Sequence, residues 1–534
     1  MGFIFWTALL ALPLLRDGML ADLSFGVHLR TGAWILANGA WPRRDVLSFT
    51  QADAPWLAWS WLFDLLAACS ERLLGLAGPV LLTILGVATF LGLLTGLLQR
   101  RTGDGLATWM LLQATAVLAS GQVLLRPHVA AWVLVLLTYA VLDGHQRTGR
   151  ARRLGWLPVL AVIWSNLHPS FMLGGALCLV YGVADLWTWR SAAGGEAEAE
   201  AEADASVGTG TGPRTGSGTN SGMGVAALGS IATGGSLGGR SICYSAAAAA
   251  ARRRIPQLLG ATVAAALASL VNPYGWRLHA QVLTFLADAP AIDRISEYAS
   301  PDFHSPEGLV LLALLFATAA RLRLRLRPVD VLVAGLAAAL ALYAQRHAPY
   351  AAALLALTLA PAWPAALARL PGPLSRALAS RRRLSLAATP RLPLAAGATV
   401  GLLVLLAWRG GLAPSAPPLE AAIDPLRTMV GQGLTLDAWN GYLLYRLAPG
   451  YRSFMDDRFE FFTADLRADY LALVEAQRRA PELLQRYNLR WVLLPLDNPL
   501  VTFLRARADW QLAFEDSGVA LLQRRAEPPV ATVP

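Results

Sequence analysis

The chain has 534 residues, of which 55% are hydrophobic, and its mean hydropathy of +0.46 excludes an ordinary soluble protein. A net charge of +10 would suit nucleic-acid binding, but the basic residues lie at the borders of apolar segments, so that class is excluded too. Cys69, Cys178 and Cys243 lack a metal-binding spacing, and no structural disulfide is expected. Composition therefore predicts a multi-pass protein of the cell inner membrane.

Apolar segments along the chain predict about eleven membrane-spanning helices, because a helix needs about 20 apolar residues to cross the hydrocarbon core. The first run lacks a basic n-region and a clear cleavage site, which predicts a membrane helix and not a cleaved signal. The expected crossings lie near residues 2–18, 77–98, 105–124, 128–143, 154–169, 170–188, 256–273, 308–321, 330–346, 348–364 and 393–409.

Arginine clusters predict the orientation of these crossings, since a short loop rich in Arg resists translocation and stays in the cytoplasm. The clusters are Arg100 and Arg101; Arg147, Arg150, Arg152 and Arg153; Arg252 to Arg254; Arg321, Arg323, Arg325 and Arg327; and Arg381 to Arg383. With these inside, the N-terminus is expected in the cytoplasm. The segments expected outside it are 19–76, 125–127, 168–170, 274–307, 346–348 and the chain after about 410.

Two stretches do not fit the pattern of crossings and turns. Residues 191–251 hold a Glu-Ala run followed by Gly, Ser, Thr and Ala, with few large apolar side chains. Such a stretch buries too little surface to offset its ordering entropy, so we expect a disordered cytoplasmic insert there. Residues 365–392 are rich in Pro and Arg and are expected to form a cytoplasmic linker.

The tail is expected to form a separate small α/β domain outside the cytoplasm, at residues 410–534, after a transmembrane domain at residues 1–409. A β-like run and two strand candidates predict a sheet, and an amphipathic segment at 464–487 predicts a helix. The strand candidates lie at 491–495 and 519–523, and the β-like run contains Tyr442, Leu444 and Tyr445. The predicted fold class is therefore a mainly α polytopic membrane protein with this small added domain.

The outer loop at 19–76 is long, polar and aromatic, and it holds Asp22, His28, Arg30 and Asp45. A carboxylate that is partly desolvated at the edge of a bilayer has a raised pKa and can act as a base near neutrality. Alternatively, Asp22 and Asp45 cap helices and the Trp residues form an interfacial belt. Spacing alone leaves both interpretations open.

Each of three predicted hairpins has a pair of polar residues at its outer end, and a nearby outer segment contains a carboxylate. Arg suits phosphate because its planar fork donates two hydrogen bonds at once, so these turns could together hold a phosphate group. The alternative is that each Arg extends its charged head to the lipid headgroups and that each His forms a hydrogen bond with an unpaired backbone group at a helix end. No His or Asp spacing on one helix predicts a metal site. The residues are Arg126 and His128, Asn166 and His168, Arg346 and His347, and Glu297.

A series of short motifs, in this order, resembles bacterial membrane proteins related to the GT-C glycosyltransferases, a superfamily that includes protein mannosyltransferase-like enzymes. The likeness covers nearly the whole chain except the insert. In the first loop it includes Asp22, His28-Leu-Arg30-Thr-Gly, Pro42-x-x-Asp45-x-x-Ser-Phe-Thr and a Trp-rich close. Further pieces are Arg126-Pro-His128, Trp164-Ser-Asn166-Leu-His168, Asn272-Pro-Tyr-Gly-Trp276, Ile295-Ser-Glu297-Tyr, Arg346-His347-Ala-Pro349, Asn440-Gly-Tyr442 and Asp456-Asp457-Arg458.

The resemblance implies an enzyme of the cell envelope that moves a hexosyl or pentosyl group from a polyprenyl-phosphate donor to a hydroxyl of a lipid, glycan or protein outside the cytoplasm, with inversion. It implies catalytic roles for Asp22 and Asp45 and the lipid-linked donor as substrate, and it leaves open whether a divalent metal takes part; no nucleic-acid partner is expected. Substrate binding is expected from His28, Arg30, Arg126, His128, Asn166, His168, Glu297, Arg346 and His347.

Two departures from the family pattern support an alternative. Leu23 follows Asp22 where a second acidic residue is usual, and Trp59-Ser60 replaces a His-Glu pair. The alternative is a GT-C-like membrane protein without catalysis, either a transporter of a lipid-linked glycan or an assembly partner.

Overall fold

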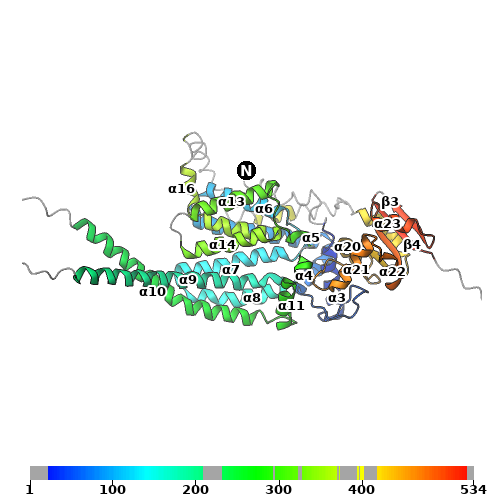
Figure 1. Cartoon of the computed structure of the whole chain (residues 1–534), viewed down its shortest axis with the longest axis horizontal. Helices are drawn as coiled ribbons and strands as arrows, with labels where there is room; N and C mark the ends of the chain where they lie inside the picture. Colours follow the sequence, from blue (N-terminus) through cyan, green and yellow to red (C-terminus); the bar gives the residue numbers. More distant parts are fainter. Residues whose placement is uncertain are drawn as a thin grey trace, which may run out of the picture.

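The computed structural model describes residues 22–208, 231–292, 295–322, 327–369, 372, 394–395, 397–401, 418–516 and 518–525. The expected crossing at 2–18 lies outside the described residues, as do Arg381 to Arg383 and most of the expected crossing at 393–409. The described part is mainly helical and carries one small sheet (Figure 1). This agrees with the predicted fold class at that level.

The helices of the bundle follow the predicted apolar segments in chain order. They are α5 (Ala77–Thr102), α6 (Gly105–Ser120), α7 (His128–Thr148), α8 (Trp156–Leu167), α9 (Met172–Gly208), α10 (Ile231–Ala268), α13 (Pro306–Leu322), α14 (Pro328–Tyr343) and α15 (Ala348–Leu359), followed by the short α16 (Trp363–Ala368). Some neighbours in the chain pack together, such as α5 with α6 and α14 with α15, and others pack with helices further along the chain, such as α5 with α7 and α8 with α10.

Glycines end two of these helices at the same end of the bundle. Gly103 after α5 and Gly149 after α7 both have φ values near +60°, at 61° and 65°, which a residue without Cβ adopts at low cost. The Gly103 N–H donates to the carbonyl of Gln99 at 3.0 Å, and the Gly149 N–H donates to that of His145 at 2.7 Å. Each cap satisfies a carbonyl at a helix end, where the chain turns back.

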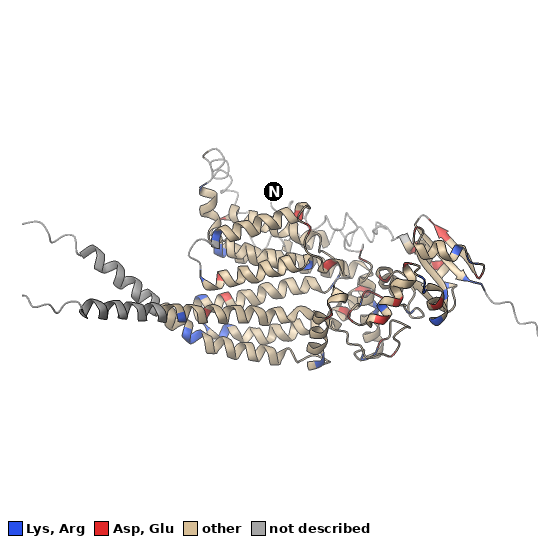
Figure 2. Cartoon of the chain, in the orientation of Figure 1, with Lys and Arg blue, Asp and Glu red and all other residues tan. Residues whose placement is uncertain are grey.

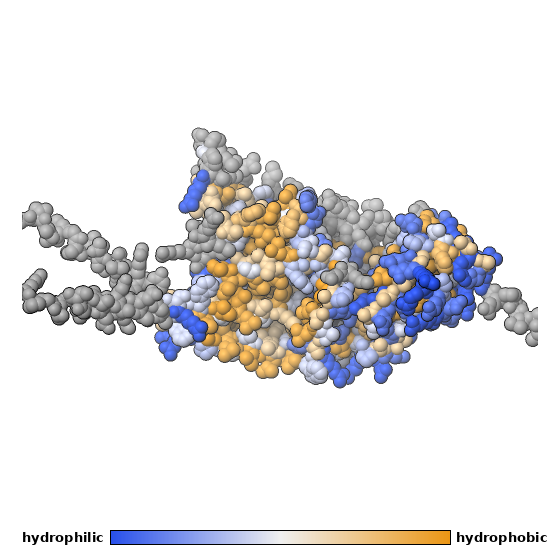
Figure 3. All heavy atoms as spheres, viewed as in Figure 1, coloured by the Kyte–Doolittle hydropathy of each residue, from blue (hydrophilic) through white to orange (hydrophobic). Residues whose placement is uncertain are grey.

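Three helical segments are long and apolar enough, by length and composition, to cross a membrane: Ala77–Thr102, His128–Thr148 and Pro169–Ala192. Figure 3 shows apolar surface over the helices, with hydrophilic surface at both ends. Large apolar side chains are exposed on several of them, such as Leu179, Leu267 and Phe316. An apolar girdle of this kind on a helical bundle is typical of contact with lipid.

The arginines after α5, α7 and α13 and before α14 converge at one end of the bundle, which we call the arginine end (Figure 2). These described arginines thus lie together at one end of the bundle, and the side of a membrane that this end faces stays a prediction. The sheet and the first loop lie at the opposite end, which we call the sheet end (Figure 1).

The segment expected to be disordered, 191–251, differs in part from that expectation. Helix α9 continues to Gly208 and α10 begins at Ile231, so helical backbone covers 191–208 and 231–251. Runs of Ala explain the difference, because Ala has the highest intrinsic helix propensity. Residues 209–230 lie outside the described part of the chain.

Shorter helices build the sheet end of the bundle. In the first loop these are α3 (Phe25–Asn38) and α4 (Trp61–Leu74). Between α10 and α13 the chain forms α11 (Trp276–Ala287), α12 (Ala289–Ile292) and the 3-10 turn η3 (Ser296–Tyr298). Two further 3-10 turns, η2 (Pro169–Phe171) and η4 (Gln345–His347), join α8 to α9 and α14 to α15.

The tail forms a four-stranded mixed sheet with strand order β1-β2-β4-β3. Strand β1 runs parallel to β2, and the other neighbours are antiparallel. The strands are β1 (Gln432–Thr435), β2 (Leu489–Pro495), β3 (Trp510–Asp516) and β4 (Val519–Arg524), and the helices beside them are α19 (Ile423–Arg427), α20 (Asp437–Arg446), α21 (Ala464–Val474), α22 (Ala480–Arg486) and α23 (Pro499–Arg505).

The strand predictions at 491–495 and 519–523 are confirmed. The β-like assignment of Tyr442, Leu444 and Tyr445 is wrong, because all three lie in α20. Tertiary contacts override local preference there, since α20 crosses α3 where Gly26 and Gly441 meet. The predicted helix at 464–487 is two helices, α21 and α22, with Ala476 between them at a φ of 52°.

The tail packs directly on the first loop. The Phe49 N–H donates to the Ser453 carbonyl at 3.0 Å, and the Ser453 N–H donates to the Leu47 carbonyl at 2.9 Å. One buried apolar cluster contains side chains of the bundle, the first loop and the tail, including Phe25, Leu443 and Trp491. The segments on either side of the predicted boundary at 409/410 thus share a hydrophobic core.

Candidate functional site

A cavity of about 550 Å³ lies at the sheet end of the bundle, and we call it the main cavity. One part of its wall is apolar and comes from α9, α11 and α14. The other part is charged and comes from the loop before α7, from η2 and η4, and from the tail. Its ionisable lining residues are His28, Arg126, His128, His168, Arg346, His347, Asp457, Arg458 and Glu460.

A row of alternating charges lies beside the main cavity, and its two arginines, Arg126 and Arg346, line the cavity. The Arg126 guanidinium forms a bidentate pair with Asp22, with Nη2 donating to Oδ1 at 2.8 Å and Nε donating to Oδ2. Its Nη1 donates to Glu297 Oε1 at 2.9 Å. The other oxygen of Glu297 lies 3.8 Å from Nη1 of Arg346. Four residues that the sequence predicts as site residues, each from a different segment of the chain, are thus brought together.

Local structure holds Arg126 and Arg346 in place. Arg126 precedes α7, and its N–H donates to the Leu124 carbonyl at 2.8 Å. Arg346 lies in η4, with its guanidinium carbon 4.6 Å from the centre of the Tyr298 ring. Turns η3 and η4 are joined because the Gln345 N–H donates to the Ala299 carbonyl at 3.0 Å. Both guanidinium groups therefore reach the cavity from backbone that is itself hydrogen-bonded.

The histidines predicted at this site all line the main cavity, and each has a neighbour that fixes its ring. His28 Nδ1 lies 2.7 Å from the buried carboxylate of Asp64, and His128 Nε2 lies 2.7 Å from the Gln122 carbonyl. His168 Nδ1 lies 2.7 Å from the Ser170 hydroxyl, and the His347 ring stacks on Tyr343 at 6.0 Å.

Three predicted binding residues lie outside the described lining of the cavity: Glu297, which pairs with Arg126 and Arg346 beside it, Asn166 and Arg30. Asn166 is buried between segments: its Oδ1 accepts from Trp61 Nε1 at 2.7 Å, and its Nδ2 donates to the Val271 carbonyl at 2.8 Å. It thereby joins the first loop to the turn after α10. Arg30 lies on α3 and is half-buried, and burial lowers its pKa.

Asp45 lies in a buried ionic cluster beside the cavity. Arg458 Nη1 donates to Asp45 Oδ1 at 2.8 Å, while its Nε and Nη2 donate to the two oxygens of Asp456, each at 2.7 Å. Asp45 also accepts from the N–H groups of Leu47 at 3.1 Å and Ser48 at 2.9 Å. It is 1% exposed and lies outside the described lining, so its carboxylate serves to join the first loop to the tail.

The structure adds Asp457 and Glu460, whose roles the sequence does not show. Asp457 lines the cavity with Oδ2 at 4.0 Å from Arg126 Nη2, and its other oxygen is buried without a hydrogen-bond partner among the described residues. Burial raises the pKa of Asp457 to about 7 against the attraction of Arg126, and burial raises the pKa of Glu460 to about 8. Both carboxyls can therefore exchange protons near neutrality.

Asp22 has the opposite electrostatic balance. Burial favours its neutral form, but the charge and hydrogen bonds of Arg126, together with hydrogen bonds from Ser24, hold the pKa of Asp22 below its ordinary value. The Ser24 hydroxyl donates to Asp22 Oδ1 at 2.6 Å. Asp22 is thus a persistent anion that orients Arg126 and accepts protons poorly.

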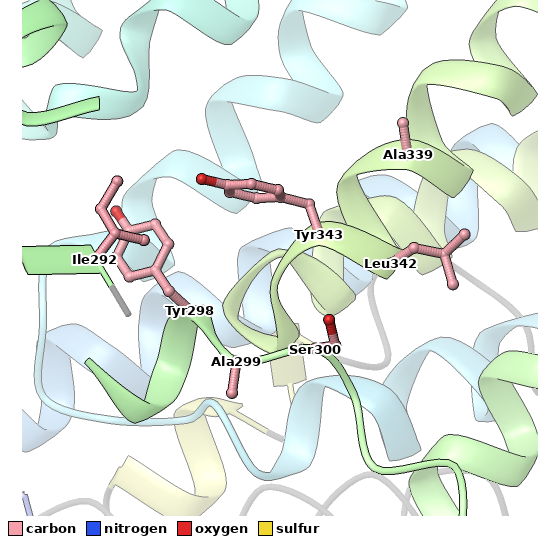
Figure 4. A pocket seen from close by; sticks show the side chains of 7 residues that line it. All are labelled: Ile292, Tyr298, Ala299, Ser300, Ala339, Leu342 and Tyr343. Atoms are coloured by element: carbon pink, nitrogen blue, oxygen red, sulfur yellow. The ribbon is translucent and has the colours of Figure 1, made fainter. Parts of the chain in front are cut away.

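A second cavity, of about 560 Å³, lies beside the main one (Figure 4). Its lining comes from the segment around η3 and from the end of α14, where Figure 4 shows Ala339, Leu342 and Tyr343. Tyr298 and Tyr343 line both cavities, so these two rings form part of the partition between them. Among the residues that the structure describes, no group of three or more His, Cys, Asp or Glu side chains could hold a metal ion.

Comparisons with known proteins give likenesses to solved structures only at the level of the fold. No protein-family model matches the chain, and no curated protein sequence matches it. Among solved structures, the apo form of an oligosaccharyltransferase from Archaeoglobus fulgidus is 12% identical over 92% of this chain and 69% of its own, with a TM-score of 0.47. At this identity and TM-score, the likeness assigns no function to the chain.

Proposed function

We propose that the chain is a multi-pass membrane glycosyltransferase with about eleven crossings. It moves a sugar from a polyprenyl-phosphate donor to a hydroxyl outside the cytoplasm, with inversion. The observation that carries the proposal is the main cavity, where Arg126 and Arg346 share the carboxylate of Glu297 beside an apolar wall. A lipid phosphate needs both kinds of surface at once. The sheet end then faces outward and the arginine end faces the cytoplasm.

The charged wall suits the phosphate that leaves in this reaction. The two guanidinium groups are preorganised by Asp22, Glu297 and Tyr298 and need little rearrangement as charge builds on the leaving oxygen. Arg is matched to phosphate because its fork donates two parallel hydrogen bonds. The neighbouring imidazoles add polar groups that can orient the sugar.

The apolar wall suits the lipid tail of the donor. Side chains from α9, α11 and α14 line it, among them Leu173, Val282, Phe285 and Leu340. Neighbouring positions on α11, such as Leu283 at 57% exposed, point apolar surface outward. A polyprenyl chain could therefore continue from the cavity onto the lipid-facing surface without meeting charge.

Asp457 suits the role of general base better than Asp22 does. In a single displacement, the acceptor oxygen attacks the anomeric carbon, its proton passes to a carboxylate, and the bond to the phosphate oxygen breaks. Asp457 lines the cavity and its Oδ2 lies 4.0 Å from Arg126 Nη2, beyond hydrogen-bond distance, whereas Asp22 accepts hydrogen bonds from Arg126 and Ser24. Asp22 then acts as a positioning residue for Arg126, and Asp45 as a structural one.

The test is transfer by the purified full chain in liposomes, supplied with a set of polyprenyl-phosphate sugars that carry labelled hexoses or pentoses. Release of polyprenyl phosphate and transfer of label to an added acceptor are expected, and both should be lost in Arg126→Gln. Asp424→Asn is a matched control, because Asp424 lies in the tail with a side chain 94% exposed.

The contrary outcome points to the alternative function. If no donor in the set is consumed while labelled lipid-linked sugar crosses the bilayer faster than in empty liposomes, the chain is a transporter and the proposal is wrong.

A further inference from the structure

A second charged pocket, remote from the main cavity, lies at the arginine end. It has a volume of about 330 Å³. Its lining comes from the ends of α5, α7 and α13, the start of α14 and the turn after α15. The lining residues are Arg100, Arg101, Arg147, Arg321, Arg327, Asp330 and Pro361.

The arginines in this pocket outnumber the carboxylates that they contact. Arg101 donates to Asp143 at 2.5 Å and to Asp330 at 3.3 Å. Arg147 Nε lies 2.8 Å from the other oxygen of Asp143, and Arg327 forms two hydrogen bonds with Asp330, at 2.9 and 3.0 Å. Two carboxylates thus serve three of the five lining guanidinium groups, which leaves an excess of positive charge.

Topology alone does not account for this arrangement. An arginine that only marks the cytoplasmic side extends its head into water. The Arg101 side chain is 3% exposed, and the Nε atoms of Arg101 and Arg321 are buried without a partner among the described residues. Buried guanidinium donors are costly to leave unpaired, and the excess positive charge of the lining would attract an anion into the pocket.

We propose that this pocket binds a phosphate-bearing anion, and that its source is the headgroup of an anionic phospholipid. The helix that carries Arg321 also exposes apolar surface: Phe316, one to two turns before Arg321 on α13, is 67% exposed. A phospholipid could place its phosphate against the arginines and its acyl chains along this surface. Basic pockets between membrane helices are known to recognise anionic headgroups in this way.

The test is native mass spectrometry of the full chain in detergent, titrated with phosphatidylglycerol and, separately, with phosphatidylcholine. The wild type should retain phosphatidylglycerol preferentially, and Arg321→Gln should weaken that retention about fivefold, the effect of one arginine near an anionic lipid. Arg321 forms no ion pair among the described residues, so its loss leaves the Asp143 and Asp330 pairs in place. Arg253→Gln, an exposed arginine on α10, is the matched control and should change nothing.

Two further arms complete the experiment. If Arg321→Gln does not fold, Arg100→Gln replaces it, since Arg100 lines the pocket and is exposed. Inorganic phosphate is added as a competitor: displacement of the lipid supports the anion site, and binding of phosphate without retention of lipid assigns the site to a soluble phosphate compound. Equal retention of both lipids, or equal retention by wild type and both variants with no effect of phosphate, overturns the proposal. None of these readouts depends on glycosyl transfer.

Discussion

Asp22 and Asp457 both lie near Arg126, but they interact with it differently. Asp22 receives two hydrogen bonds from the guanidinium group, whereas the nearer oxygen of Asp457 is 4.0 Å away. The first carboxylate is therefore held as an anion, and burial raises the pKa of the second to about 7. The assignment of the base follows from this difference, and it can be tested by pH.

We expect the rate of transfer to rise about tenfold per pH unit below pH 7 and to level off above it, because Asp457 accepts a proton only when ionised. Asp457→Asn should lower the rate by about 10²- to 10⁴-fold and remove this dependence. Initial rates of polyprenyl phosphate release across the pH range measure both. An unchanged pH profile in the variant contradicts the assignment.

Asp22→Asn should behave differently. The variant weakens the hold on Arg126 and so lowers the rate, but the rise with pH toward 7 should remain, because the base is still present. The same rate measurements separate the two roles. A flat profile in Asp22→Asn would instead make Asp22 the base, as the sequence suggested.

Asp457 also predicts a stability effect of defined sign. Its pKa is raised from an ordinary value of 3.8 to about 7, so the native state binds the proton more tightly than the unfolded state does. The stability that this provides is complete below about pH 4 and is lost as the pH rises through 7. Asp457→Asn should therefore stabilise the protein at pH 8, by an amount on the order of 1 kcal/mol or more, and have much less effect at pH 4. Thermal unfolding at the two pH values checks this, with Asp424→Asn as the unchanged control.

At the scale of elements, the contact between α3 and α20 positions the tail on the first loop. A Cβ atom at Gly441 would lie 2.3 Å from the Leu23 carbonyl oxygen, and one at Gly26 would lie 1.9 Å from the Gly441 carbonyl oxygen. Two helices approach this closely only where both carry glycine. The crossing also sets the backbone just after Asp22, and hence the pairing with Arg126.

Gly441→Ala should accordingly destabilise the protein by about 3 kcal/mol or more, since backbone atoms have to move to admit the methyl group. Gly450→Ala is the control in the same segment, because no atom lies within 4 Å of a Cβ there. Unfolding temperature in detergent is the measurement. Equal stability of the two variants would mean that the helices can separate without cost.

The helices and the turns of the bundle could be predicted because apolar length and Arg placement are local properties of the chain. Arg126, His168 and Arg346, each at the outer end of a predicted hairpin, could be expected at one level of the bundle for this reason. The assignment of Tyr442 to a strand failed because a crossing with α3 decides the structure of that segment. Asp457 was not assigned a role, because its pKa depends on burial that arises only when the tail packs on the bundle.

For the whole molecule, the arginine end and the sheet end should face opposite sides of the membrane. Arg253→Cys and Arg490→Cys place exposed thiols at the two ends, in a chain whose three native cysteines are replaced by Ala. A membrane-impermeant maleimide added to intact cells should label position 490 only, and position 253 should react after the membrane is opened. Labelling of both from outside contradicts the proposed orientation.

The pairing of Asp45 with Arg458 sets an order of events during synthesis. The partners are 413 residues apart in the chain, so the first loop leaves the ribosome long before its guanidinium partner is made. Until then Asp45 lacks the ion pair with Arg458 that later joins the first loop to the tail. The helices of the bundle are thus synthesised before the tail can complete the wall of the main cavity, to which Asp457, Arg458 and Glu460 belong.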